Sequence, residues 1–322
     1  MGLARGTKTR LMAGFLVLLL SGCASVPPFR PDPGLPRQTE LEHTPFFPQE
    51  AHQCGPSALA TLLNYRGVRV TPQELQPQVF LPERQGSLQI ELAATARRYG
   101  LLAYPLAPTL DALLREVAAG NPVLVLQNLA FDWIPRWHYA VVIGYDLQQR
   151  EILLRSGRER RWRSGLKSFA RTWQRAGNWG LVILSPDSVP ETAELMPYLR
   201  SALELEQSGE QKAALAAYRS ASRHWPDDAR AWLALGNLSH AMKMSRESII
   251  ALQTASRLDP ENPIIWNNLA YSFLQGSCPM RAVEAIGKAL TLAPGDSNLQ
   301  QSHQEINELA GRLDRSDCKL TK

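Results

Sequence analysis

Residues 46–60, FFPQEAHQCGPSALA, and residues 137–145, WHYAVVIGY, decide the fold of the middle of the chain. The first stretch leads into an apolar helix predicted over residues 54–66. Cys54 therefore stands where unpaired N–H groups and the helix dipole favour a negative charge, which lowers the pKa of a thiol. His138 opens a predicted strand in the second stretch. A thiol and an imidazole placed this way can form a thiolate–imidazolium pair, in which the imidazole accepts the thiol proton and later protonates a leaving amine.

The pattern around these stretches predicts an α+β domain over residues 39–187. Further helices are predicted over 88–99 and 109–119, each stopped by a glycine. Short apolar runs, rich in Val, Ile, Leu or aromatic residues and too short for helices, follow at 123–129, 138–145, 151–155 and 180–184. Helices that precede an antiparallel sheet are typical of an α+β domain.

The two motifs together resemble the bacteriocin-leader-processing (double-glycine) peptidases, which are papain-like cysteine peptidases, and their stand-alone relatives. The resemblance covers about residues 40–187 and implies a peptide or protein substrate. It also implies that Cys54 is the nucleophile, His138 the general base and Gln49 the oxyanion-hole side chain. The family usually has its glutamine six residues before the cysteine, whereas Gln49 lies five before it. Either the loop differs by one residue or Gln53 takes part.

The third catalytic position departs from the family pattern, because Ser156-Gly157 stands where Asp-Pro is expected. A serine can orient an imidazole by a hydrogen bond, but it cannot stabilise an imidazolium as a carboxylate does. We therefore expect a cysteine peptidase that uses a Cys54–His138 dyad, with Ser156 as the candidate third member. The alternative is a catalytically degenerate peptidase fold that serves as a protein-binding scaffold. Acyl transfer of the transglutaminase kind uses the same dyad and stays open.

A period of 34 residues predicts an all-α solenoid of three tetratricopeptide repeats over residues 195–296. Four columns keep this spacing: Pro226, Pro260 and Pro294; Ala214, Ser248 and Ala282; Ala221, Ala255 and Ala289; Trp232 and Trp266. The first repeat is degenerate, with Tyr198 and Ser201 at the tryptophan and leucine positions of the consensus. Residues 297–322 are expected to hold a polar capping helix and a tail. The repeats are expected to bind the substrate or a protein partner.

The boundary between the two domains is expected near residues 186–192. The α+β domain keeps its own pattern up to that point, and the repeat period begins after it. We therefore expect a chain that ends near residue 190 to fold by itself.

The N-terminus predicts export. Residues 1–22 hold a short basic stretch and an apolar run of ten residues, too short to span a bilayer, as in a signal peptide. Leu20-Ser21-Gly22-Cys23 resembles the lipobox of bacterial lipoproteins, which implies acylation of Cys23 and attachment to the membrane. Ala24 follows, and by that resemblance the protein belongs at the outer membrane of a Gram-negative cell, facing the periplasm. The proline-rich residues 23–38 are expected to be an extended stalk.

Composition and cysteine content exclude other classes. The chain has 322 residues, 44% of them hydrophobic, and a formal charge of +5. Three of its positive charges lie in the predicted signal peptide, so the remainder is too near neutral for a dedicated nucleic-acid binder. The four cysteines form no CxxC pair and no HExxH motif occurs, so neither a metal nor another cofactor is predicted. Cys278 and Cys318 are expected to form a disulfide between the last repeat and the capping helix, with two free thiols as the alternative.

Overall fold

The structure is a computed structural model that describes residues 31–50, 53–84, 86–313 and 318. The predicted signal peptide, Cys23 and most of the predicted stalk lie outside these residues. Within the described part of the chain, the helices are all too short or too polar to cross a membrane.

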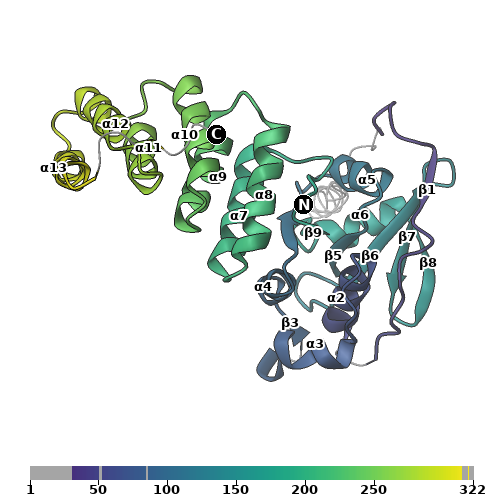
Figure 1. The fold of residues 1–322 in the computed structure, drawn as a ribbon. Helices are drawn as coiled ribbons and strands as arrows, with labels where there is room; N and C mark the ends of the chain where they lie inside the picture. Colours follow the sequence, from purple (N-terminus) through teal and green to yellow (C-terminus); the bar gives the residue numbers. More distant parts are fainter. Residues whose placement is uncertain (1–30, 51–52, 85, 314–317, 319–322) are drawn as a thin grey trace, which may run out of the picture. The chain divides into compact units, whose positions relative to one another are not determined.

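A seven-stranded antiparallel sheet organises the first domain (Figure 1). Its strands are, in spatial order, β4 (Leu102–Pro105), β9 (Gly180–Leu184), β5 (Val123–Asn128), β6 (Trp137–Asp146), β7 (Glu151–Ser156) and β8 (Glu159–Gly165), and β1 (Gln38–Glu40) pairs with the end of β6. The four predicted strands are present. The prediction missed β1, β4 and β8. The charged and exposed residues of β8 show no apolar alternation, and backbone pairing with β7 holds it in the sheet together with the ion pairs Arg161–Glu40 and Arg163–Glu151.

Helices cover the sheet on both faces. The helices of one face are α2 (Cys54–Tyr65), α3 (Pro72–Val79) and α4 (Gln89–Arg98), with the short β2 (Phe80–Leu81), β3 (Gly86–Ser87) and a 3₁₀ turn (Pro82–Arg84) between them. Their apolar side chains share one core with alternate residues of β6, namely Tyr139, Val141 and Ile143. Helices α5 (Leu110–Ala118) and α6 (Leu166–Gln174) contact β5 away from that core. The α+β class is confirmed.

Seven helices make up the repeat region (Figure 1). They are α7 (Leu195–Gln207), α8 (Gln211–His224), α9 (Ala229–Ala241), α10 (Ser245–Leu258), α11 (Pro263–Gln275), α12 (Pro279–Leu292) and α13 (Ser297–Gly311). Each helix packs on the next, and α7, α9 and α11 also contact one another in order. This is the arrangement of tetratricopeptide repeats, so the predicted solenoid is confirmed.

The 34-residue period has a direct structural cause. The indole N–H of Trp232 donates to the carbonyl oxygen of Pro226 at 2.8 Å, and Trp266 makes the same 2.8 Å bond to Pro260. Gln300, one period further on, donates its amide to Pro294 at 2.9 Å. The columns of small residues are fully buried where paired helices cross. Helix α13 therefore continues the repeat geometry beyond the third pair.

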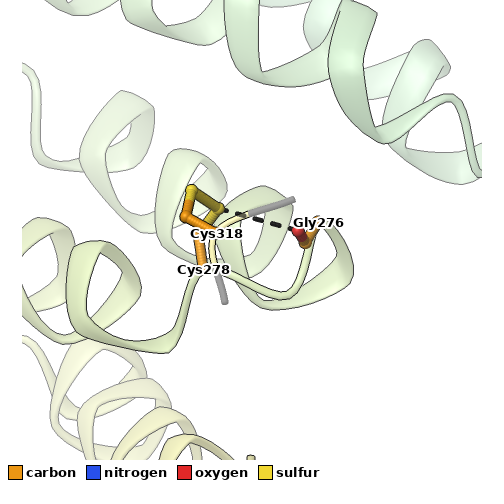
Figure 2. Close-up of a disulfide and its surroundings, with 3 residues drawn as sticks. All are labelled: Gly276, Cys278 and Cys318. Carbon is orange, nitrogen blue, oxygen red and sulfur yellow. Dashed lines mark hydrogen bonds between the residues drawn. A yellow bond between two sulfur atoms is a disulfide. The ribbon is translucent and has the colours of Figure 1, made fainter. Parts of the chain in front are cut away.

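A disulfide joins Cys278, which lies between α11 and α12 and directly precedes α12, to Cys318, 40 residues later (Figure 2). Cys278 is 1% exposed, and the carbonyl oxygen of Gly276 lies 3.6 Å from its Sγ. Cys318 packs against the same apolar cluster as α11, α12 and α13. The bond ties the tail of the chain to the third repeat.

The first repeat shares its core with the sheet. Leu102 and Tyr104 of β4 are buried against Leu195 and Tyr198 of α7. The hydroxyl of Tyr104 accepts a hydrogen bond from the backbone N–H of Glu194 at 3.1 Å. That a chain ending near residue 190 folds by itself stays a prediction, and these contacts indicate that such a chain would lose part of its stability.

Ending the chain at residue 190 is expected to weaken the sheet domain by about 4 kcal/mol relative to a chain that ends at residue 225, because Leu102 and Tyr104 lose their cover. Urea unfolding of both forms, followed by circular dichroism, measures the difference. Equal midpoints and slopes would show that the sheet does not depend on the first repeat.

Candidate active site

Cys54 is the first residue of α2 and is half-buried. It lies on the wall of a pocket of about 430 Å³, whose lining also includes Ser87, Trp137 and Tyr139. Gly55 brings α2 against the β3 strand, because a Cβ at this position would lie only 2.4 Å from Ser87 Oγ. The Cys-Gly pair therefore allows the thiol to sit beside the pocket.

Gly55→Ala is expected to destabilise the first domain by about 1 to 3 kcal/mol, since the added methyl group must push Ser87 away. Gly287→Ala is the control: it lies inside α12, where a Cβ would have no neighbour within 4 Å. That change should stabilise its helix by about 0.5 to 1 kcal/mol. Urea unfolding of both variants distinguishes them, and a neutral Gly55→Ala would contradict the steric argument.

His138 meets Ser156. The imidazole lies near the start of β6, and its Nε2 is 2.8 Å from Ser156 Oγ, at the end of the neighbouring β7. Ser156 thus occupies the position from which a third catalytic residue orients the ring. When Nε2 carries the proton it donates to Ser156 Oγ, and Nδ1 is then the ring nitrogen with a free lone pair.

Gln49 bridges the same two strands. Its Nε2 donates to the carbonyl oxygen of Tyr139 at 3.2 Å, and its Oε1 accepts from the backbone N–H of Gly157 at 2.9 Å. Its own backbone N–H donates to the Gly157 carbonyl at 2.8 Å. Gln49 therefore fixes the residues that directly follow His138 and Ser156, while the second Nε2 hydrogen is left for another acceptor. Gln53, the alternative glutamine, donates to Gln76 of α3 at 3.4 Å.

Cys54 approaches the histidine strand at Tyr139, the residue after His138. The backbone N–H groups of Tyr139 and Gly55 act to lower the pKa of the thiol, and the pKa of Tyr139 is raised by burial and, to a smaller extent, by the nearby Cys54 thiolate. Among the hydrogen bonds of the described residues, none joins Cys54 Sγ to the His138 ring. The structure thus brings His138, Ser156 and Gln49 together and places Cys54 beside the same strand.

Burial keeps both groups neutral. Desolvation raises the pKa of the Cys54 thiol and outweighs the neighbouring N–H groups. Desolvation, together with the positive charge of Arg136, lowers the pKa of His138 to about 4. The expected lowering of the thiol pKa is therefore wrong for this geometry, because the helix start that favours the anion is itself withdrawn from water.

Arg155 supports the site in a way that the sequence did not reveal. It closely precedes the exposed arginines of β8 in the sequence, but it is only 4% exposed itself. Its guanidinium donates to the carbonyl oxygens of Glu42 and Thr44 at about 3 Å and so holds the segment that leads to Gln49. The burial of Arg155 could have been predicted from strand alternation, because Arg155 lies two residues after the core residue Leu153 and so faces the same side of the sheet.

The described part of the chain contains no cluster of three or more His, Cys, Asp or Glu residues that could hold a metal ion.

Comparison with known proteins supports the same two domains. Residues 41–180 match the model of the Peptidase_C39 like family, and residues 195–238 match a tetratricopeptide repeat model. No curated protein matches the chain. Residues 41–180 are therefore similar to the Peptidase_C39 like family, and helices similar to tetratricopeptide repeats follow them.

Three solved structures are similar to parts of the chain. A candidate C39-like peptidase from Bacillus anthracis is 18% identical, with 46% of this chain and 98% of that chain covered and a TM-score of 0.40. A double glycine motif protease from an AMS/PCAT transporter, in complex with its leader peptide, is 20% identical, with 44% and 90% covered and a TM-score of 0.34. The type III secretion translocator chaperone SycD from Yersinia enterocolitica is 19% identical, with 37% and 89% covered and a TM-score of 0.33.

Proposed function

We propose that this protein is a cysteine peptidase in which Cys54 is the nucleophile and His138 the general base. The observation that carries the proposal is the 2.8 Å contact between His138 Nε2 and Ser156 Oγ. This contact orients the His138 ring and leaves Nδ1 free. The next residue of the same strand, Tyr139, lies beside the Cys54 thiol. The pocket beside Cys54 supplies room for a peptide.

The reaction follows from these groups. As Cys54 Sγ attacks the carbonyl carbon of the peptide bond, His138 Nδ1 takes the thiol proton. When the C–N bond breaks, the imidazolium gives that proton to the departing amine and a thioester remains on Cys54. Water, deprotonated by His138, then attacks the thioester and releases the carboxylic acid and the thiol. The second Nε2 hydrogen of Gln49 is our candidate donor to the oxygen that becomes negative.

Because His138 is neutral in the resting enzyme, it acts as a general base and does not form an imidazolium before the substrate binds. No carboxylate stands at position 156, and Arg136 opposes a second positive charge nearby. The proton therefore moves only when a substrate carbonyl is present. Reaction of Cys54 with iodoacetamide is accordingly expected to be slow at pH 6 and to rise with pH, in contrast to a preformed ion pair.

A non-catalytic scaffold is the second candidate. The serine at position 156 and the burial that keeps both groups neutral favour it, because an imidazolium without a carboxylate partner is poorly stabilised. The repeats would then be the main binding element.

We also propose that the repeats bind a protein partner or the substrate. A pocket of about 430 Å³ between α7 and α9, whose lining includes the apolar side chains of Met196, Leu199 and Leu203, supports this proposal. Met196 and Leu203 are nearly half exposed, as expected for side chains that a ligand covers.

We propose that lipid attached to Cys23 holds the protein on the outer membrane, with the protein facing the periplasm. Cys23→Ser is expected to give an unprocessed precursor or a soluble secreted form, because acylation needs the cysteine sulfur. Fractionation of a Gram-negative host, with detergent extraction and mass spectrometry of the N-terminus, measures this. Recovery of a mature, detergent-extracted lipoprotein from Cys23→Ser would refute the proposed anchor.

Incubation of the purified full chain with a library of short synthetic peptides tests the catalytic proposal. New amino termini should appear with the native protein and be lost in Cys54→Ala. A native protein that cleaves nothing while binding the same peptides would favour the scaffold.

A further inference from the structure

The pocket beside Cys54 has a lining that is more apolar than polar, and Arg84, Ser87 and Gln89 are the polar side chains among the described residues that line it. Leu88, Leu126 and Ala176 contribute to it, together with the rings of Trp137 and Tyr139. Trp137 and Tyr139 are two residues apart in β6 and so face the same side of the sheet. At about 430 Å³ the pocket is at the small end of the range for ligand sites, with room for one large side chain and the backbone around it.

The charge of the lining also restricts the occupant. Arg84 is the charged residue among the described residues that line the pocket, and no acidic side chain lies among them. A lysine or arginine of a substrate would lose hydration there, would find no carboxylate among these residues to pair with, and would be opposed by the positive charge of Arg84. An apolar side chain loses nothing and covers the exposed part of Trp137, which is 54% of that residue.

The loop that leads into β6 carries a further group of exposed apolar side chains. Phe131, Trp133 and Ile134 are 63%, 76% and 59% exposed. The rings of Phe131 and Trp133 stack with their centroids 5.8 Å apart. Such a cluster adds nothing to the core, and its position only a few residues before Trp137 indicates a surface that a ligand covers.

We propose that the substrate of Cys54 is a peptide with a large aliphatic or aromatic side chain within two residues of the bond that is cut, and that this side chain enters the pocket against Trp137. The inference rests on the proposed peptidase function and names its substrate class. Trp137 is the specificity-determining residue, and Phe131, Trp133 and Ile134 contact the peptide further from the bond.

The test is cleavage-site profiling with the full chain and a library of short synthetic peptides of even composition. Leu, Ile, Met, Phe, Tyr and Trp together should be enriched at least about fivefold within two residues of the cleaved bonds. Among the bonds that Trp137→Ala still cuts, this enrichment should fall to near the library frequency, and the overall rate should fall as well because a binding contact is lost. Trp162→Ala is the matched control, because Trp162 is a tryptophan on β8 that is 50% exposed and outside the pocket lining.

The outcomes separate this inference from the function on which it rests. Cleavage by the native protein without apolar enrichment, or with a preference for glycine or basic residues, would overturn the inference and leave the peptidase intact. If the Trp137→Ala variant keeps the enrichment of apolar residues near the cleaved bonds, this pocket does not select the substrate side chain and the inference is overturned. No cleavage of any peptide would remove the proposed function and the inference together.

Discussion

His138→Gln is expected to lower kcat/KM for peptide hydrolysis by at least about a thousandfold. Glutamine can fill the space and keep a hydrogen bond to Ser156, but it cannot accept the proton of Cys54. Ser156→Ala should cost only about three- to tenfold, because the hydroxyl orients the ring without taking part in proton transfer. Initial rates with a peptide identified in the cleavage assay measure both variants.

The pH profile adds a readout that a purely structural role would not affect. Since the pKa of His138 is lowered to about 4, the base is neutral at pH 5 and above and becomes protonated only as the pH approaches 4. The acid limb of kcat/KM is therefore expected near pH 4. Ser156→Asp should move it to higher pH and should speed the alkylation of Cys54 at pH 6, because a carboxylate favours the imidazolium. A His138→Gln variant within tenfold of native activity would show that another group is the base.

Acid destabilisation is the second large effect. A buried histidine with a lowered pKa binds its proton more weakly when the protein is folded than when it is unfolded. Its stabilising contribution is therefore complete above the ordinary pKa of 6.5 and is lost as the pH falls toward about 4. We expect the native protein to lose about 3 kcal/mol of unfolding free energy from this group between pH 7 and pH 4.

Comparison of native protein with His138→Gln isolates this contribution, since both carry the same carboxylates. Urea unfolding at pH 7, 5 and 4, followed by circular dichroism, should show a smaller loss for the variant. Ser156→Asp should also reduce the loss, because the carboxylate stabilises the charged ring. An equal fall for native protein and His138→Gln would show that His138 is not held neutral in the fold.

The repeat region was predictable in detail because its structure depends on local spacing. Small residues recur every 34 positions where paired helices cross, and Trp232 bonds a carbonyl only six residues away. Contacts between residues this close in the chain can be predicted from the local sequence pattern. Even Gln300, whose bond to Pro294 repeats that of Trp232, stands at the spacing that the tryptophans define.

The predicted helix at Cys54 and the strand at His138 are likewise local features, since they follow from apolar runs and from Gly55-Pro56. The strand β8 was missed because backbone pairing with β7, and not its own pattern, makes it a strand. The choice of Cys54, His138, Gln49 and Ser156 as candidate site residues came from motif resemblance.

What these residues do to one another was decided by tertiary structure. Gln49 bonds to Tyr139, 90 residues further along the chain, and Arg155 bonds to Thr44, 111 residues away, so no spacing could announce either contact. The direction in which the pKa of the Cys54 thiol shifts also depends on tertiary structure. The sequence determined that the Cys54 thiol lies at the start of a helix, which favours the thiolate. The packing of α2 against the sheet determined how far the thiol is exposed to solvent. Desolvation depends on every neighbour at once, and for that reason only the folded chain could show that burial outweighs the helix start.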